Sequence, residues 1–282
     1  MAVTLTVRDL SPRFLAFYEK ALDADPESRW ALFQEHYNFA AVPPTEQGRQ
    51  MARRALDENF HRYPEALELI RQGAAGFRPE VGQVVEAVSQ ALDFDQEMEI
   101  QVVFFVGMFD KNAFQATLNG KYLVNLPLEG GYDRTPYVVA HELTHALHAK
   151  LSNDPGGWIR SIAVSMMQEG LAVWTSRAVF PGYSDEEYLG AFSPGWYGRC
   201  RAADRAILEG IRPHLAEASQ EALQRFILGP GPAGLDREVY WAGWRAVGHL
   251  LEQGHSLGRL ARLTEAEATP LLDRALAELL EP

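Results

Sequence analysis

The chain has 282 residues, which is enough for one large domain or two closely associated ones. A hydrophobic content of 47% and a charged content of 23% are ordinary for a globular protein, and the longest apolar run, residues 100–109, is too short to span a bilayer as a helix. The net charge of −12 argues against nucleic acid or an anionic membrane surface as a partner.

Cysteine content and the N-terminal residues bear on the compartment. The single cysteine, Cys200, excludes an intramolecular disulfide. Arg8, Asp9 and Arg13 interrupt the N-terminal region, which is not typical of a signal peptide. We therefore expect a cytoplasmic protein without membrane attachment.

The first third of the chain is predicted to be mostly helical. Val3–Val7 alternates apolar and polar residues, as a half-buried strand does. Helical patterns then continue to about residue 90, with breaks near Pro43-Pro44 and near residues 73–79.

Residues 98–128 change character and predict a small sheet. The stretch EIQVVFFVGMF is β-branched and aromatic, as in a buried strand. Phe114–Leu118 and Lys121–Leu128 predict two more strands, joined at Asn119-Gly120, because Asn-Gly is a strong hairpin signal. Pro127 indicates that the last strand lies at the edge of the sheet, since proline cannot donate a ladder hydrogen bond.

From Pro136 onward the pattern predicts helices and loops with no strand. The fold class is therefore expected to be α+β, mostly helical, with a small sheet before the helix that starts at Pro136. We expect an N-terminal helical part at residues 1–96 and a second part at residues 97–282, packed together as one compact molecule.

The predicted helix after Thr135-Pro136 carries His141-Glu142-Leu143-Thr144-His145, which fits H-E-x-x-H. Histidines at i and i+4 are neighbours on one helix face, so both imidazoles can reach one metal ion. The intervening glutamate, Glu142, can reach a water on that ion without being a ligand. The alternative is a helix with ordinary surface histidines, because the short motif also occurs by chance.

The third ligand is expected outside this helix. His148 is seven residues from His141, about 10 Å along the helix axis, which is too far for both to hold one ion. Ser161–Phe180 predicts a mostly apolar helix whose charged residues are Glu169 and Arg177. A buried carboxylate is costly unless it is paired or bound to metal. Glu169 is therefore the candidate third ligand, and pairing with a buried arginine or hydroxyl is the alternative.

HELTH followed by a helix bearing QEGLAVW resembles the gluzincins, zinc peptidases with a downstream glutamate ligand, and is most similar to a largely uncharacterised family of predicted zinc-dependent proteases. The resemblance covers about residues 121–180. It implies a zincin-like fold, Zn²⁺ held by His141, His145 and Glu169, and Glu142 as the catalytic base. Such families often place an aspartate where this chain has Val173, so the residue that would accept a hydrogen bond from the other ring nitrogen of a ligand histidine is not identified.

This resemblance implies hydrolysis of peptide bonds by a metal-activated water, with a peptide or protein as substrate. Gluzincins supply an oxyanion donor from a helix downstream of the third ligand, and Tyr240 is the first candidate, with His249 and His255 as alternatives. Tyr240 can instead be a core aromatic. By analogy, the strand Tyr122–Leu128 is expected to bind an extended peptide as an added strand.

Two other functions fit the same motif. The first is a zinc hydrolase that acts on a non-peptide amide or ester. The second is a metal-stabilised binding module without catalysis, in which replacing Glu142 would change no function. Oligomeric state and peptide specificity have no signal in the sequence.

Overall fold

The computed structural model describes residues 3–42, 45–110, 113–118, 120–130, 135–154, 159–190 and 193–281. The chain divides into two compact units. The sheet unit comprises residues 3–84 and 99–139, and the helical unit comprises residues 85–98 and 140–282. The sheet thus groups with the N-terminal helices, whereas the division expected at residue 96 placed it with the H-E-x-x-H helix.

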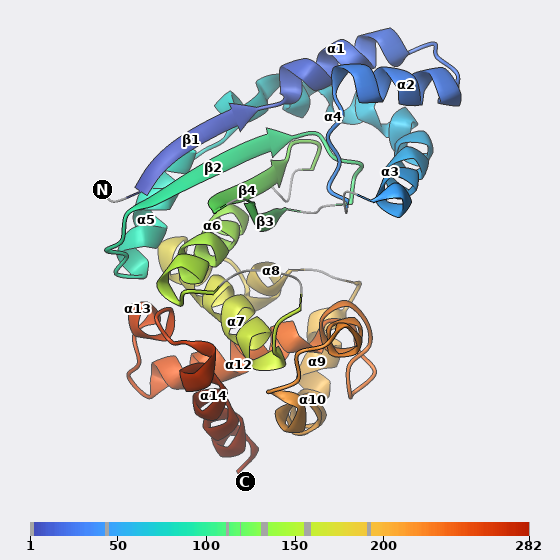
Figure 1. The fold of residues 1–282 in the computed structure, drawn as a ribbon. Helices are drawn as coiled ribbons and strands as arrows, with labels where there is room; N and C mark the ends of the chain where they lie inside the picture. Colours follow the sequence, from blue (N-terminus) through green and yellow to red (C-terminus); the bar gives the residue numbers. More distant parts are fainter. Residues whose placement is uncertain are drawn as a thin grey trace. The chain divides into compact units, whose positions relative to one another are not determined.

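The sheet unit consists of helices and a small sheet (Figure 1), with the bounds β1 Val3–Asp9, α1 Ser11–Ala21, α2 Pro26–His36, α3 Glu46–Asn59, α4 Tyr63–Gln72, β2 Met98–Phe105, β3 Phe114–Leu118 and β4 Lys121–Pro127. Within the described residues, the strands form one four-stranded sheet in the order β1-β2-β4-β3. β2 and β4 are parallel, and β3 and β4 are antiparallel. The sheet is therefore mixed, and the predicted α+β class with a small sheet is confirmed.

The hairpin predicted between β3 and β4 is present. Leu118 pairs with Lys121 at its end, which leaves a two-residue connection. Gly120 has φ +74°, a conformation that glycine adopts without steric cost and that short hairpin turns require. Asn119 lies outside the described residues.

The predicted edge position of β4 is wrong. β4 lies between β2 and β3, and β3 is the outer strand. Pro127 is tolerated because strand pairing with β3 ends where Phe114 pairs with Asn125, two residues earlier. On the other side, the Leu128 N–H donates to Phe105 O at 2.8 Å, so β2 does not need an N–H from Pro127. Both edges of Tyr122–Asn125 are paired, so β4 cannot accept a peptide as an added strand.

Buried aromatic side chains explain why β2 belongs with the N-terminal helices. The Tyr37 hydroxyl, between α2 and α3, donates to Val106 O at 2.9 Å and accepts from Val106 N at 2.6 Å. The Tyr63 hydroxyl, at the start of α4, donates to Gly107 O at 2.8 Å. Their rings pack around Phe14 of α1, with centroid distances of 5.3 and 4.8 Å. The end of β2 is thus fixed by residues from three distant segments.

The helical unit contains the remaining described α-helices. These are the greater part of α5 Val81–Ala91 and of α6 Pro136–Leu151, together with α7 Ile162–Val179, α8 Asp185–Leu189, α9 Trp196–Ala202, α10 Asp204–Ile211, α11 Gln220–Ala222, α12 Glu238–Glu252, α13 Leu257–Leu260 and α14 Glu265–Leu280. Beyond residue 136, the described residues contain no strand, only an isolated bridge between Pro230 and Asp236. Across the described ranges, no helix combines the length and apolar character needed to cross a membrane.

Candidate metal site

The helix α6 positions the two histidines of the H-E-x-x-H motif. Leu143, Leu147 and Leu151 are buried and anchor one face of the helix in the core. His141 and His145 lie one turn apart, with ring centroids 4.7 Å apart. The i, i+4 spacing therefore places the two rings side by side, as the sequence predicted.

The helix α7 supplies the carboxylate. Ser161 caps its N-terminus, where its hydroxyl oxygen accepts a hydrogen bond from Val164 N at 3.3 Å. Most of the helix is buried, as the apolar pattern predicted, and Glu169 is buried with it. An ionised carboxylate in such a place needs a compensating partner.

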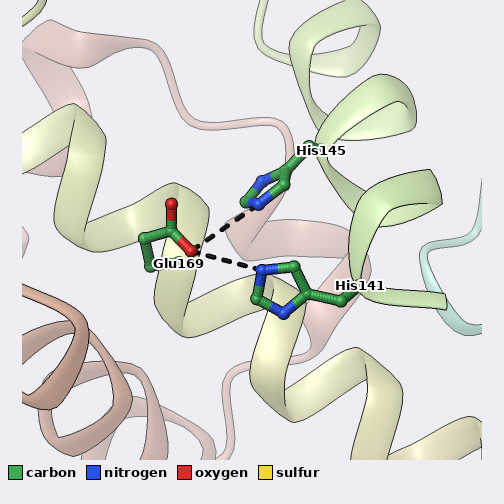
Figure 2. Close-up of side chains that lie close together, drawn as sticks. All are labelled: His141, His145 and Glu169. Carbon is green, nitrogen blue, oxygen red and sulfur yellow. Dashed lines mark ion pairs between the residues drawn. The ribbon is translucent and has the colours of Figure 1, made fainter. Parts of the chain in front are cut away.

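The three predicted ligands come together at the facing surfaces of α6 and α7 (Figure 2). Glu169 Oε2 lies 3.3 Å from His141 Nε2 and 3.6 Å from His145 Nε2. The three ligand atoms all lie within 4.8 Å of one another. The structure therefore gathers His141, His145 and Glu169 closely enough to hold a metal ion.

The distances from Glu169 to the two histidines can be compared with those in a metal site and in a buried ion pair. Two ligand atoms about 2.1 Å from one ion, at a tetrahedral angle, lie about 3.4 Å apart. A charge-assisted hydrogen bond between nitrogen and carboxylate oxygen is shorter, about 2.7–2.9 Å. The observed distances of 3.3 and 3.6 Å match the first value. Glu169 Oε2 is buried, and the two imidazoles are the charged partners that lie beside it.

The side chains of the cluster are mostly buried but keep some exposure. The side chains of His141 and His145 are 18% and 15% exposed, and that of Glu169 is 11% exposed. Two imidazole nitrogens and one carboxylate are typical protein ligands of a catalytic zinc site, in which water takes the remaining position. The donor set thus fits the ion that the motif predicts.

The three side chains of the cluster shift one another's pKa values. Burial alone raises the pKa of Glu169, but the His145 and His141 imidazoles lower it by more, so its net pKa is far below the usual range. Burial lowers the pKa of His141, but the Glu169 carboxylate and the charge of Glu142 together raise it above the ordinary value. Without metal, Glu169 is therefore ionised at neutral pH and favours a proton on His141.

Glu142 is buried on α6 between the two histidines, with an exposed fraction of 8%. Its negative charge raises the pKa values of His141 and Tyr240, which places it within electrostatic reach of both. This location is compatible with the role of a base beside the three gathered ligand atoms.

A pair of glycines brings α12 against α7. A Cβ atom added to Gly170 would lie 2.3 Å from Gly243 O, and one added to Gly243 would lie 2.4 Å from Met166 O. The helix backbones therefore touch where side chains normally separate them. One turn further along, Trp174 Nε1 donates to Trp244 O at 2.8 Å. These contacts set the register of α12 relative to the ligand helix.

Tyr240 stands one turn before Gly243 on α12 and is half-buried. Burial raises the pKa of Tyr240, and the carboxylates of Glu169 and Glu142 raise it further. These interactions place the phenol near the carboxylates of the cluster and keep it protonated at neutral pH. A protonated phenol in that position is a hydrogen-bond donor.

The other histidines named from the sequence have different surroundings. His148 is buried, and burial together with the charges of His145 and Arg160 lowers its pKa to about 3, so it is neutral at physiological pH. His249 Nε2 lies 2.8 Å from Glu278 Oε2, which engages its ring at the contact of α12 with α14. His255 follows α12, and its Nδ1 is buried without a hydrogen bond.

Two arginines near the cluster were not singled out from the sequence. Arg237 precedes α12, with its guanidinium carbon 5.6 Å from the centroid of the Tyr240 ring. Arg160 immediately precedes the cap of α7, and its charge lowers the pKa values of Tyr240 and His148. An arginine next to a helix cap is common in sequences. The signal for Arg160 in the sequence is its position directly before the helix that carries the third ligand.

Comparison of the chain with protein-family models, with curated proteins and with solved structures finds no match. The resemblance to the gluzincins therefore depends on the motif residues and their arrangement alone. The identity of the metal and the reaction are therefore proposed from the geometry of the site.

Proposed function

We propose that the protein is a zinc-dependent peptidase with a zincin-like site. The observation that carries the proposal is the convergence of His141, His145 and Glu169, whose ligand atoms lie within 4.8 Å of one another, with Glu142 buried on the helix of the two histidines. The two nitrogens and one carboxylate oxygen are preferred ligands of catalytic zinc. Zinc bound there would supply Lewis acidity, which promotes ionisation of water and polarises a substrate carbonyl.

Glu142 is assigned the role of general base. Its carboxylate would take a proton from the attacking water and later deliver it to the leaving amine. Burial next to the ligands keeps the carboxylate close to the reacting atoms.

Tyr240 is assigned the role of hydrogen-bond donor to the oxyanion that forms when water attacks the carbonyl. A raised pKa keeps its hydroxyl proton in place at neutral pH, and the glycine contact fixes the position of α12 beside α7. Donors arranged before the reaction stabilise developing charge strongly, by about 3–4 kcal/mol for one such donor.

The test compares metal content and peptide cleavage in the protein purified without chelators. We expect about one zinc per chain. Glu142→Gln should retain the zinc and lower kcat by about 10²–10⁴, because the base is lost. Tyr240→Phe should retain the zinc and lower kcat by about 10²–10³, because the donor is lost. Zinc is measured by mass spectrometry, and cleavage is measured with a fluorogenic peptide library.

Glu221→Gln is the matched control, because Glu221 is exposed on α11 of the same unit. It should change neither zinc content nor turnover. Zinc binding without turnover of any peptide would reject the peptidase and leave a metal-stabilised binding module. Peptide cleavage that survives Glu142→Gln at the full rate would reject the mechanism.

A further inference from the structure

The C-terminal end of α6 is fixed by a backbone motif that carries Asp154. The Asp154 N–H donates to Ala149 O at 3.0 Å, and Asn153 has a φ of +54°. A left-handed residue followed by such a hydrogen bond is the Schellman motif, which ends many helices. The Ser152 hydroxyl also donates to His148 O at 2.8 Å. Asp154 is therefore held in place relative to α6, although it lies beyond the last helical residue.

A buried amide on α7 contacts that carboxylate. Gln168 Nε2 donates a hydrogen bond to Asp154 Oδ2 at 2.7 Å, and Gln168 is 5% exposed. Burying an amide without a partner costs free energy, and a hydrogen bond to a carboxylate is stronger than one between neutral groups. This hydrogen bond joins the middle of α7 to the end of α6.

The residue that follows Gln168 is the third ligand. Glu169 Oε2 lies 3.3 Å from His141 Nε2 and 3.6 Å from His145 Nε2, both on α6 (Figure 2). Consecutive side chains of a helix point about 100° apart, so Gln168 and Glu169 reach two different parts of α6. Two points of attachment restrict the sliding and turning of α7 relative to α6 more than one point does.

Stability alone does not require a polar pair at this place. Most of α7 is buried, and an apolar side chain would also be buried there. Replacing both partners of a buried hydrogen bond by apolar groups of the same shape can leave stability nearly unchanged. A satisfied polar contact supplies a defined geometry, because hydrogen bonds are directional. A metal site needs such a geometry, since affinity depends on how its ligands are oriented.

We infer that the hydrogen bond between Gln168 and Asp154 positions the third ligand, and that it holds Glu169 at ligand distance from the two histidines. Gln168 is a positioning residue, because it acts through Glu169 and is not itself a ligand. The inference rests on the metal site of the proposed function and does not depend on which bond the protein cleaves.

The first measurement is the zinc affinity of the full-length chain, by competition with a chromophoric chelator at about pH 8. Gln168→Met removes the N–H donor and keeps a side chain of similar length. We expect it to bind zinc about tenfold more weakly than the wild type, as is common when a residue that orients a ligand is lost.

Visible absorption of the Co²⁺-loaded protein is the second measurement, because a loss of stability alone would not change it. Four-coordinate Co²⁺ absorbs more strongly than Co²⁺ of higher coordination, so the spectrum reports the ligand geometry. Gln168→Met should alter the spectrum. The matched control is Ser176→Ala, which removes another buried polar group from α7, a hydroxyl that donates to Ala172 O. It should keep the wild-type spectrum and zinc affinity.

Substitutions of the acceptor assign the effect to the hydrogen bond. Asp154→Ala should weaken zinc binding as Gln168→Met does, and the double variant should be no weaker than either single variant, because one contact is lost in all three. Asp154→Asn keeps an acceptor oxygen and should retain most of the affinity and the wild-type Co²⁺ spectrum. If Gln168→Met does not fold, Asp154→Ala tests the same contact from outside the helix.

The outcomes separate this inference from the proposed function. Wild-type zinc affinity and Co²⁺ spectrum in the Gln168 and Asp154 variants overturn the inference and keep the metal site. Losses that add in the double variant, or a lower Tm with an unchanged Co²⁺ spectrum, also overturn it. The expected losses in a protein that cleaves no peptide support the inference and reject the peptidase. A wild type that binds no zinc overturns the inference together with the metal site.

Discussion

At the scale of single residues, the candidate site depends on one carboxylate in an apolar helix. Glu169 could be predicted as a ligand because a charge in such a helix requires a partner and H-E-x-x-H requires a third ligand. Arg160 could not be predicted in the same way, because an arginine at a helix start is normally solvated. Its Nε atom is buried without a hydrogen-bond partner, and only the structure shows that.

The protonation of the ligands predicts how metal affinity depends on pH. The pKa of His141 lies above its ordinary value of 6.5, and the pKa of Glu169 lies below its ordinary value of 4.5. Ligands must be unprotonated to bind metal, so protons compete at His141 already above pH 6.5, whereas Glu169 stays ionised. Lowering the pH through the pKa of His141 should therefore weaken zinc binding by about tenfold per pH unit for one displaced proton.

Competition between the protein and a chromophoric chelator, from about pH 8 to about pH 6, measures this dependence. His148 does not contribute to it, because burial and nearby positive charge already keep that ring neutral, with a pKa of about 3. Glu221→Gln should give the same slope as the wild type. A zinc affinity independent of pH in this range would contradict the arrangement of His141 beside Glu169.

At the scale of helices and strands, local patterns predicted where each element lies in the sequence better than they predicted which elements pair. The bounds of α6 and α7 follow from a Thr-Pro start, a serine cap and long apolar faces, all of which are local. The place of β4 is not local. It depends on the pairing of β4 with β2, although β3 lies between these two strands in the sequence. Pro127 indicates only that one N–H is missing, and a strand end tolerates this as well as a sheet edge does.

The contact of α7 with α12 predicts a large effect from one methyl group. Gly243→Ala would place its Cβ 2.4 Å from Met166 O, and a helix backbone cannot yield as a side chain can. We expect the free energy of unfolding to fall by about 1–3 kcal/mol, as overpacking costs. Any folded protein should also show a lower kcat, because α12 carries Tyr240. Chemical denaturation and peptide turnover measure the two effects.

Gly198→Ala is the control for that substitution. Gly198 lies in α9, and an added Cβ would meet no atom within 4 Å. The helix propensity of alanine should then raise the free energy of unfolding by about 0.5–1 kcal/mol. If both substitutions stabilised the protein, the close approach of the two helix backbones would be refuted.

At the scale of the whole molecule, the division of the chain could not be found from the sequence. The helical unit is discontinuous, since residues 85–98 and 140–282 are separated by part of the sheet unit. Composition changes along the chain, by contrast, mark only continuous segments. The assignment of β2 to the N-terminal helices depends on hydrogen bonds from Tyr37 and Tyr63 to the residues after that strand, which are remote in sequence.

Metal binding should raise the thermal stability of the protein. An ion that binds the folded state alone adds about 4 kcal/mol to the free energy of unfolding when its concentration is about 1,000 times Kd. We expect scanning calorimetry to show a higher Tm with zinc and a lower one after chelation. Glu169→Ala should lose most of the shift, because one of three ligands is gone. An equal shift in that variant would mean that zinc binds elsewhere.

The glycine contact also yields a pattern that can be searched for in other sequences. Glutamate is followed directly by glycine on the ligand helix, as in Glu169-Gly170, and tyrosine precedes glycine by three residues on α12, as in Tyr240 and Gly243. Neither glycine tolerates a side chain, so we expect no other residue type at these two positions. A chain with H-E-x-x-H, then Glu-Gly, then Tyr-x-x-Gly would share this helix pairing, whereas chance occurrences of H-E-x-x-H would lack the last two elements.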